Sequence, residues 1–539
     1  MALRASRRRA MQAALATAAA VTLPRTHAAA QQATPTVGGE ATITTAQVQS
    51  ALDRLDGLIE DGMTQTGLPG AAVAVVYNDE VVYERGFGVR EVGKPEPVTP
   101  ETVFPIASLS KPLSSTLVAA VVGDGTTSWD ATIGSLVPEF ALADPYVSDQ
   151  VTIRDMLSHR SGLPAYGGDP LISNFGYDRD ECLRRLRHYA LATPFRTTWA
   201  YSNLGFSSGA YAAAQAAGQT WEDLAEERLF TPLGMTSTSY RFEDFERWEN
   251  RAAPHYRTRD GVWELGDLTD DDAAAPAGGV SSNLRDLTHW LRLHLAGGTF
   301  EGQQVVASEP LRETYRPQIV QFSLPDPTTG PPAFYGLGWT VSYDDQGRLD
   351  VTHPGDFNSY STQATLLPGA GLGILVLCNG GASAVRGAIP KAFLEMVTQG
   401  EPSQNWVSTI ETSFSAALAS IVETSSPFPQ GEPPADAAPA LPLDVYTGAY
   451  SDTMHGEVTV REENGALVLK FGPTGVQHRL DPWDRDAFSY LLTGSEGAQL
   501  AQYGVLFIVG PEGQAVAAEI NLGGVGPDGV ATFTRVIGS

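Results

Sequence analysis

The chain has 539 residues, which is too long for one ordinary domain and long enough to build a large hydrophobic core. Its 35 basic and 62 acidic residues give a formal net charge of −27, which excludes nucleic acid and anionic membrane as natural partners. Neither an H-E-x-x-H motif nor paired cysteines occur, so no metal site is expected, and Cys182 and Cys378 are expected to be two separate thiols.

Residues 1–30 have the organisation of a signal peptide. A start rich in arginine precedes an apolar run from Ala10 to Leu23, and Ala28-Ala29-Ala30 offers a small-residue cleavage site. Ser6-Arg7-Arg8-Arg9 indicates the twin-arginine route. The alternative is a membrane anchor, for which the apolar run is short. We therefore expect export to the periplasm or the medium, with no stable membrane insertion, and a disordered segment over residues 31–44.

The folded part is expected to begin with a helix and a hairpin. Apolar residues at helical spacing predict a helix over residues 45–66. Two strand-like runs, Ala71–Tyr77 and Val81–Val89, are joined at Asn78-Asp79, a spacing typical of a β-hairpin. A second helix is expected to begin at Ser108 or just after it, because Pro112 is tolerated only in a first turn.

That second helix carries the first reactive pair. A serine hydroxyl needs a base within hydrogen-bond reach to become a nucleophile, and positions i and i+3 share one helix face. Ser108 and Lys111 have this spacing. Lys111 is one of only four lysines in the chain, and unlike an arginine it can lose its proton when desolvated. The pair therefore predicts a serine nucleophile with a lysine base, and backbone N–H groups at the helix start would hold an oxyanion.

Residues 130 to about 300 are expected to be mostly helix and loop. Within them, Tyr201 and Asn203 stand two residues apart, so an extended segment would present both on one side. A phenol can relay a proton to a leaving group, and an amide can orient a substrate carbonyl. Taken alone, the tripeptide favours an ordinary core tyrosine and a turn-forming asparagine.

Strands return over Leu349–Asn379, and Val385–Val397 is expected to be a helix. His353-Pro354-Gly355 lies between two strand-like stretches. Gly355 would let a substrate backbone approach closely, and His353 would face a substrate carboxylate or the Tyr201–Ser108 pair. Because strands stand at both ends with helices between them, we predict an α+β domain over residues 45–424 whose antiparallel sheet joins distant parts of the chain.

A second domain is expected to follow a proline-rich linker over residues 425–442. Glycines and Asn464-Gly465 mark turns between short strands, a pattern typical of a small antiparallel barrel or sandwich over residues 443–539. Its role is either packing and stability or coverage of the active-site mouth. The expected strands are Glu457–Val460, Ala466–Phe471, Gln477–Leu480, Phe488–Leu492, Gly504–Val509, Ala515–Ile520 and Ala531–Val536.

Taken in this order, Ser108-Leu109-Ser110-Lys111, Tyr201-Ser202-Asn203 and His353-Pro354-Gly355 resemble the three active-site elements of the serine β-lactamase and penicillin-binding-protein superfamily. The C-terminal part resembles the lipocalin-like domain of some of these hydrolases. Resemblance to the class C β-lactamase-like branch extends over about residues 45–400, through Thr99–Phe104, Leu157–Pro164, Pro232–Met235, Ala277–Val280 and Tyr335–Trp339.

The resemblance implies a β-lactamase/transpeptidase-like fold and an acyl-enzyme mechanism without a cofactor. Ser108 would be the nucleophile, Lys111 and Tyr201 would transfer protons, and Asn203, His353 and Gly355 would bind substrate. Many relatives carry lysine where this chain has His353, which favours ester substrates or short peptides, including those with D-residues, over β-lactams. The alternatives are a β-lactamase or D-Ala-D-Ala carboxypeptidase, an inactive peptide-binding protein and, more weakly, a metal-dependent hydrolase. The oligomeric state is left open.

Overall fold

The computed structural model describes residues 43–258, 261–321, 332–344, 346–357, 359–414, 432–473, 475–491, 502–523 and 529–536. The predicted signal peptide and residues 425–431 of the predicted linker lie outside these ranges. Ile43 and Thr44, expected to be disordered, instead belong to the folded domain: Ile43 is buried, and Thr44 caps the first helix. No described helix has the length and apolar character needed to cross a bilayer.

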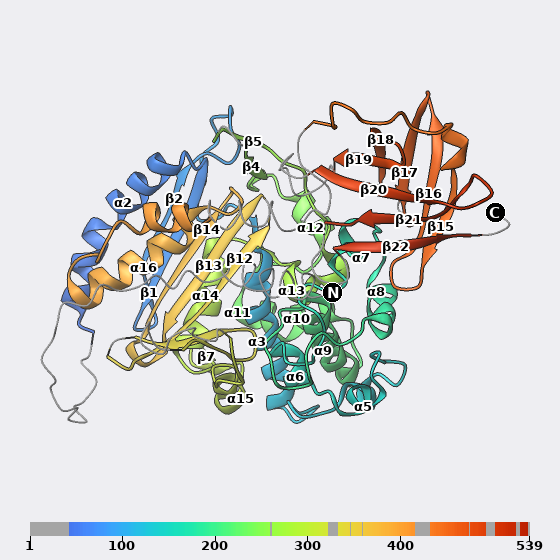
Figure 1. Ribbon diagram of the computed structural model, residues 1–539. Coiled ribbons are helices and arrows are strands. Elements are labelled where there is room, and N and C mark those ends of the chain that lie inside the picture. The colour runs from blue at the N-terminus through green and yellow to red at the C-terminus, as the bar shows by residue number, and fades with distance from the viewer. Residues whose placement is uncertain are drawn as a thin grey trace, which may run out of the picture.

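An eight-stranded antiparallel sheet forms the centre of the first domain (Figure 1). It joins the predicted N-terminal hairpin to the C-terminal strands, and Asn78 and Asp79 form the hairpin turn with φ of 51° and 65°. In spatial order the strands are β2 (Glu80–Gly88), β1 (Gly70–Tyr77), β14 (Leu372–Cys378), β13 (Tyr360–Leu367), β12 (Leu349–Phe357), β11 (Thr340–Tyr343), β10 (Phe334–Tyr335) and β9 (Ile319–Val320).

Both faces of the sheet are covered, because alternate residues of β1 pack into two separate cores. Ala71, Val73 and Val75 pack with the helices α2 (Thr45–Thr66) and α16 (Ala384–Gln399). Ala72, Ala74 and Val76 pack with α3 (Ser110–Gly123) and α14 (Leu284–Leu295). The predicted helices over 45–66 and 385–397 are confirmed. Cys182 and Cys378 are free buried thiols in different cores.

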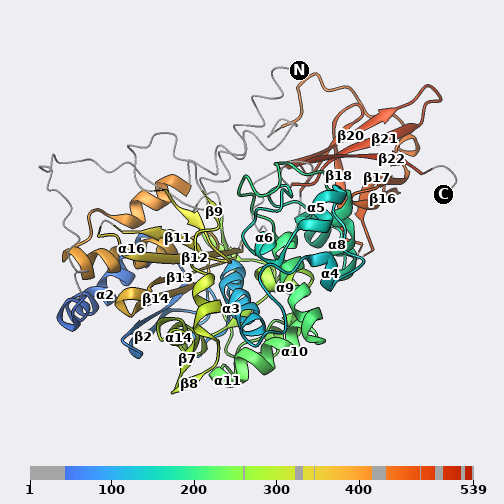
Figure 2. The ribbon, with the colours of Figure 1, turned by 90° about the horizontal axis from the view of Figure 1, so that it is seen from below.

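A mainly helical region lies beside the sheet, and α3 stands between the two (Figure 2). The short strand pairs β3 (Phe104–Pro105) with β6 (Ser281–Ser282), β4 (His255–Arg257) with β5 (Trp263–Leu265) and β7 (Thr299–Phe300) with β8 (Gln303–Gln304) complete the domain. Its remaining α-helices are α4 (Ile133–Leu136), α5 (Pro145–Gln150), α6 (Ile153–Leu157), α7 (Asp169–Ser173), α8 (Arg179–Arg185), α9 (Asn203–Ala217), α10 (Trp221–Ala225), α11 (Thr231–Leu233), α12 (Phe242–Arg247), α13 (Ala275–Gly278) and α15 (Ser308–Glu313).

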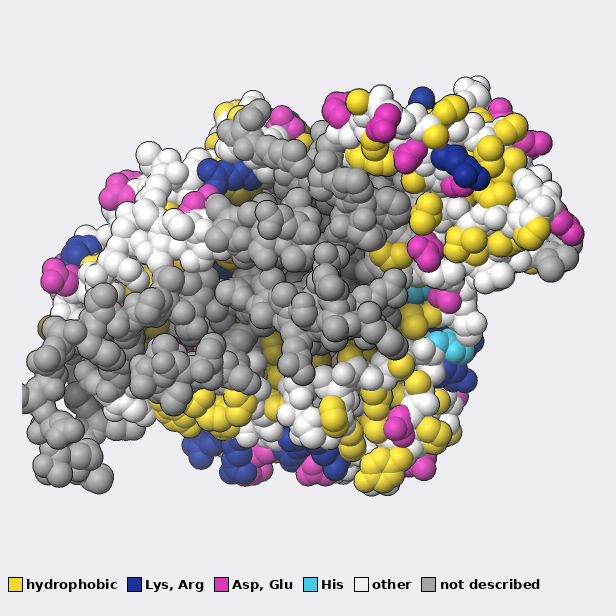
Figure 3. All heavy atoms as spheres, viewed as in Figure 1, with side chains coloured by type: hydrophobic (Ala, Val, Ile, Leu, Met, Phe, Trp, Pro, Cys, Tyr) yellow, Lys and Arg dark blue, Asp and Glu magenta, His cyan; other side chains and the backbone are white. Residues whose placement is uncertain are grey.

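The second domain is a closed eight-stranded barrel, which confirms the predicted all-β fold. β15, which the sequence did not predict, closes it by pairing with β22 through Tyr450 and Arg535. Apolar side chains gather on its outer wall among acidic ones (Figure 3), and Leu506, Ile508 and Val516 are exposed. The strands are β15 (Gly448–Asp452), β16 (Gly456–Glu463), β17 (Ala466–Phe471), β18 (Gln477–Asp484), β19 (Ala487–Leu491), β20 (Gln502–Val509), β21 (Ala515–Asn521) and β22 (Val530–Arg535).

Candidate active site

Ser108 lies in a tight turn directly before α3. The turn is a 3-10 segment, η1 (Ala107–Leu109), and Ala107 adopts a left-handed backbone with φ of 51°, which is uncommon for a residue with a Cβ. Ser110 fixes the turn, because its Oγ donates to Ala107 O at 2.6 Å and accepts from the backbone N–H of Val280 at 3.1 Å. The helix begins at Ser110, so Ser108 stands just before its start, as the proline position predicts.

Lys111 reaches back from the first turn of α3 to the serine. Its Nζ lies 3.2 Å from Ser108 Oγ, 2.7 Å from Asn203 Oδ1 and 2.8 Å from the carbonyl oxygen of Ala277. The side chain is completely buried. Burial lowers the pKa of Lys111 from 10.5 to about 7, although the nearby carboxylates Asp169 and Asp271 raise it. Near neutral pH a large share of this amine is therefore uncharged.

The partners of Lys111 Nζ suit an uncharged amine as well as an ammonium. Asn203 Oδ1 and Ala277 O can only accept hydrogen bonds, so they engage two N–H groups. In a neutral amine the remaining position is a lone pair, and it faces Ser108 Oγ. Serine can donate its proton to that lone pair, which is the arrangement required for general-base activation.

Tyr201 contacts the same serine from the other side. Its hydroxyl donates to Ser108 Oγ at 2.8 Å, and its ring centroid lies 4.5 Å from Lys111 Nζ. Burial raises the pKa of Tyr201 well above its ordinary value of 10, so the phenol keeps its proton in the resting site. Ser202, the next residue, caps helix α9 by accepting from the backbone N–H of Gly205. The cap places Tyr201 immediately before the helix.

Asn203 lies between Lys111 and Asp169. Both ends of its amide are already engaged within the protein: Oδ1 accepts from Lys111, and Nδ2 donates to Asp169 Oδ2 at 2.9 Å. Because a carboxylate can only accept, Asp169 fixes which end of the amide faces the lysine. Asn203 therefore positions Lys111, and its predicted role of orienting a substrate carbonyl stays a prediction.

His353 and Gly355 lie inside β12, which runs through the predicted break between two strands. Pro354 is tolerated there because β11 pairs with β12 only as far as Thr352. Gly355 has a structural reason to be glycine: a Cβ would lie 2.2 Å from Ile106 O, so its absence lets β12 pack against the turn that precedes Ser108. The space beside its Cα is filled by the protein itself, in contrast to the substrate approach expected from sequence.

The imidazole of His353 is buried and bonded to a tyrosine that the sequence did not single out. His353 Nε2 lies 2.9 Å from the hydroxyl of Tyr335, and burial lowers the pKa of His353 to about 3. The ring is therefore neutral at physiological pH. Nδ1 lies 2.6 Å from the carbonyl oxygen of Pro354, so both ring nitrogens have partners within the protein, and neither partner is Tyr201 or Ser108, one of the two contacts expected from sequence.

Sequence reasoning also missed an aromatic wall around Tyr201. The ring of His159 lies 4.5 Å from that of Tyr201 and 4.9 Å from that of Tyr335, and Trp199 lies 5.9 Å from both tyrosines. The backbone N–H of Ser202 donates to His159 Nδ1 at 3.1 Å, so the imidazole holds the residue after Tyr201. The available signal was the segment Leu157–Pro164, which the sequence analysis used only as a family resemblance.

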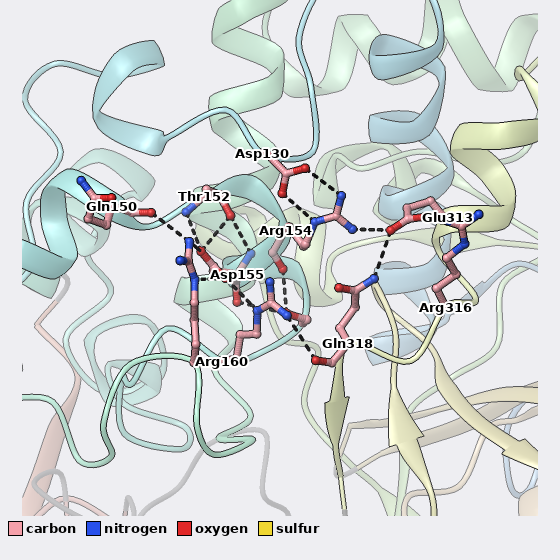
Figure 4. Close-up of polar contacts among 11 residues, drawn as sticks. Asp130, Gln150, Thr152, Arg154, Asp155, Arg160, Glu313, Arg316 and Gln318 are labelled. Atoms are coloured by element: carbon pink, nitrogen blue, oxygen red, sulfur yellow. Dashed lines mark hydrogen bonds and ion pairs between the residues drawn. The ribbon is translucent and has the colours of Figure 1, made fainter.

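A polar network anchors the segment that carries His159 (Figure 4). The buried carboxylate of Asp155 accepts from Arg160 Nε at 2.7 Å and from Arg196 Nη2 at 2.7 Å. Arg154 binds Asp130 at 2.7 Å and also forms an ion pair with Glu313, and Arg160 donates to the backbone carbonyl before β9. The network joins α6 to the edge of the sheet, and His159 takes a left-handed backbone with φ of 57° between these anchors.

Within the described residues, no three His, Cys, Asp or Glu side chains are grouped so that they could hold a metal ion. The site thus consists of a serine, a lysine that is partly uncharged near neutral pH and a tyrosine, which meet around one oxygen atom. Such an arrangement can form and release an acyl group with proton transfer among these three side chains.

Comparison with known proteins agrees with this geometry. The model of the family described as Beta-lactamase matches residues 55–394, and that of a domain of unknown function, DUF3471, matches residues 432–529. The unguisins hydrolase ungD′ of Aspergillus campestris is 26% identical over 484 residues, which cover 85% of this chain and 86% of that protein. Penicillin-binding protein 4 of Amycolatopsis lactamdurans is 29% identical over 346 residues, covering 61% and 85%.

Among solved structures, the octameric penicillin-binding protein homologue from Pyrococcus abyssi is similar to this chain with a TM-score of 0.56. The likeness covers 87% of this chain and 98% of that one at 18% identity. At this identity the likeness is evidence for the fold alone, and it confirms the predicted β-lactamase/transpeptidase-like fold.

Proposed function

The chain belongs to the β-lactamase family and is a serine hydrolase, and from this premise we propose that it hydrolyses ester or short peptide bonds through an acyl-enzyme on Ser108. The observation that carries the proposal is the position of Lys111 Nζ. It is held by two acceptors, Asn203 Oδ1 and Ala277 O, and directed at Ser108 Oγ.

The proposed acylation step moves one proton and exchanges one bond. Lys111 takes the proton of Ser108 as Oγ attacks the substrate carbonyl carbon, and the carbonyl oxygen becomes an oxyanion. The tetrahedral intermediate then expels the leaving alcohol or amine. Tyr201, hydrogen-bonded to Ser108 Oγ, donates its proton to the leaving atom and recovers one from the Lys111 ammonium.

Deacylation reverses the roles of the same groups. Lys111, again uncharged, takes a proton from water as the water attacks the ester carbonyl of the acyl-enzyme. Collapse of the second tetrahedral intermediate breaks the bond to Oγ, releases the acid and returns the proton to Ser108. The chain supplies every proton carrier in this cycle, so the proposal needs no cofactor.

Substrates without a carboxylate beside the scissile bond are the proposed class. A substrate carboxylate is held best by a cation, and the buried, neutral His353 supplies none. Aromatic side chains surround Tyr201 instead, with the rings of Tyr166 and Trp199 at 5.3 Å and 5.9 Å from its ring. We therefore place esters and short peptides, including those with D-residues, ahead of β-lactams. Hydrolysis of β-lactams or of D-Ala-D-Ala peptides is the second candidate, favoured by the similarity to penicillin-binding protein 4.

Labelling with a fluorophosphonate probe tests the mechanism directly. We expect one adduct on the peptide that contains Ser108, and loss of the adduct in Ser108→Ala. The neighbouring Ser110, whose hydroxyl is engaged in the turn, is the internal control and should remain unmodified. A p-nitrophenyl ester, a D-amino-acid amide and nitrocefin then separate the candidate substrates. An unmodified, well-folded wild type would refute the mechanism and favour a peptide-binding role.

Export is part of the proposal. The arginine-rich start, the apolar run from Ala10 to Leu23 and the Ala28-Ala29-Ala30 site support twin-arginine transport into the periplasm or the medium. The test is to express the chain in a host with this pathway and to measure the mass of the protein recovered outside the cytoplasm. That mass should correspond to a chain whose first residue lies near position 31. Arg7→Lys with Arg8→Lys should retain the precursor inside, whereas Arg4→Lys is the control. Export of the double variant at the normal level would contradict the route.

A further inference from the structure

One continuous segment, residues 166–177, connects the active site to the barrel. Its first part lies against the site: the backbone N–H of Tyr166 donates to Tyr201 O at 2.7 Å, and the two rings lie 5.3 Å apart. Three residues later, Asp169 begins α7 and accepts from Asn203 Nδ2 at 2.9 Å. This part of the segment therefore contacts Tyr201 and Asn203, the residues that are hydrogen-bonded to Ser108 and Lys111.

The last part of the segment is built into the barrel. Phe175 is fully buried and belongs to the barrel core, with its ring centroid 5.3 Å from Phe471 and 6.3 Å from Phe533. Asn174 Nδ2 donates to Leu522 O at 3.0 Å, at the end of β21. Figure 1 shows α7 between the barrel and the helical region.

The barrel is shaped to receive this segment. A Cβ on Gly472 would lie 2.7 Å from Phe175 O, and one on Gly456 would lie 2.1 Å from the hydroxyl of Tyr177. Both glycines have positive φ, so the two strand ends approach the segment more closely than other residues would allow. Tyr177 also donates to His455 O at 3.1 Å. These close contacts hold the segment in one position and also stabilise the barrel.

We propose that the barrel positions the active-site lysine, because Phe175 anchors α7 and thereby holds Asp169 against Asn203, which in turn holds Lys111. The inference rests on the proposed function, in which Lys111 is the base. Hydrogen bonds within the segment make it stiff enough to transmit a displacement: Phe175 N donates to Pro170 O at 3.1 Å, and Leu171 N donates to Gly168 O at 2.9 Å. Phe175 is a positioning residue, since it lies far from the reacting atoms in the contact chain.

The electrostatics give this coupling a measurable signature. Asp169 raises the pKa of Lys111, so a displacement of α7 lowers that pKa further while freeing the Asn203 amide to turn. A merely weakened barrel changes neither the charge near Lys111 nor its partners. The charged and titratable groups that face Lys111 from the surrounding elements are Asp169, Asp271, His159, His353 and Tyr201.

The experiment measures the rate of fluorophosphonate labelling of the full chain as a function of pH. Below its midpoint the rate should follow the uncharged fraction of Lys111. For Phe175→Ala we expect the plateau rate to fall about tenfold or more, because misplaced catalytic groups lose their orientation, and the midpoint to move to lower pH. Asp169→Asn should do the same. The double variant should be no slower than Asp169→Asn alone, because both changes act on one contact chain.

Two variants separate positioning from stability. Phe488→Ala removes an equally buried barrel aromatic that packs on Tyr446 and Phe507, and it should leave the midpoint unchanged. Phe175→Leu should restore most of the rate. If Phe175→Ala fails to fold, Asn174→Ala, which removes one hydrogen bond to the barrel, asks the same question. Equal midpoint shifts in Phe488→Ala and Phe175→Ala, or independent effects in the double variant, would overturn the coupling.

The outcome also distinguishes this inference from the function on which it rests. Absence of labelling in the wild type refutes the serine mechanism and the coupling together. Normal wild-type labelling, with Phe175→Ala and Asn174→Ala both unchanged in rate and midpoint, refutes the coupling alone.

Discussion

Replacing Lys111 with methionine tests the buried amine without any substrate. Burial lowers the pKa of Lys111 from 10.5 to about 7 in the folded protein. The difference of about 3.5 corresponds to about 5 kcal/mol by which the fold disfavours the ammonium. Because the folded pKa is below the unfolded one, the unfolded chain binds more protons between pH 7 and 10.5. In that window the lysine makes the free energy of unfolding rise with pH.

The size of the effect follows from these two pKa values. Between about pH 6 and about pH 9 the wild type should gain about 2–3 kcal/mol of stability relative to Lys111→Met. At about pH 6 nearly the whole penalty for the charged amine is present, and by about pH 9 more than half of it is gone. The hydrogen bonds that methionine cannot make to Asn203 and Ala277 add a constant, which cancels in the pH dependence.

Urea denaturation followed by tryptophan fluorescence measures this difference, because Trp290 and Trp339 stack at 5.7 Å in the core of the hydrolase domain. Lys94→Met, which removes an exposed amine paired with Glu91, is the matched control and should stay parallel to the wild type. A stability difference between the wild type and Lys111→Met that stays constant from about pH 6 to about pH 9 would refute the reasoning. It would mean that Lys111 remains an ammonium throughout this range.

Three further predictions concern Asn203, His353 and the network that anchors the His159 segment. Asn203→Leu should lower kcat on a p-nitrophenyl ester by about 10²-fold with little change in KM, because it misplaces the base and not the substrate; a change confined to KM would restore the substrate-binding role. His353→Gln should leave the acid limb of the labelling rate in place, because the pKa of His353 is about 3; disappearance of the limb would assign it to the histidine. Asp155→Asn should lower the free energy of unfolding, measured by thermal denaturation, by about 2–3 kcal/mol, since it breaks a buried pair with two arginines. Arg247→Ala, which breaks an exposed pair, should lower it by under about 1 kcal/mol. Equal losses in the two variants would contradict the stabilising role of the network.

The parts of the fold that the sequence predicts are those with a local signature. The hairpin turn at Asn78-Asp79 needs two left-handed residues, and asparagine and aspartate tolerate that conformation. Seven of the barrel strands alternate in hydrophobicity or lie between turn signals. The eighth, β15, has only Ala449 and Tyr450 buried in succession, without alternation. It is a strand because β16 and β22 flank it, and β22 lies more than 80 residues away in the chain.

The candidate site divides in the same way. Ser108 and Lys111 are visible in sequence because one helical turn brings them together. Asp169 is not, since an aspartate between Gly168 and Pro170 is ordinary turn chemistry until α9 places Asn203 beside it. Tyr335 reaches His353 only through the pairing of β10, β11 and β12. The role of Asn203 in positioning Lys111 follows from contacts that no local pattern encodes.

The local motif supplies proximity, and the distant residues supply the protonation state. The three partners of Lys111 Nζ fit both of its forms, because an ammonium has three N–H groups for three acceptors and an amine has two with a lone pair. Geometry alone therefore does not select the base, and burial decides. With a pKa of about 7, the two forms have nearly equal free energy at neutral pH. Lys111 is therefore uncharged often enough to accept the Ser108 proton as Oγ attacks, and its ammonium is acidic enough to give the proton up again, which a cycle of acylation and deacylation requires.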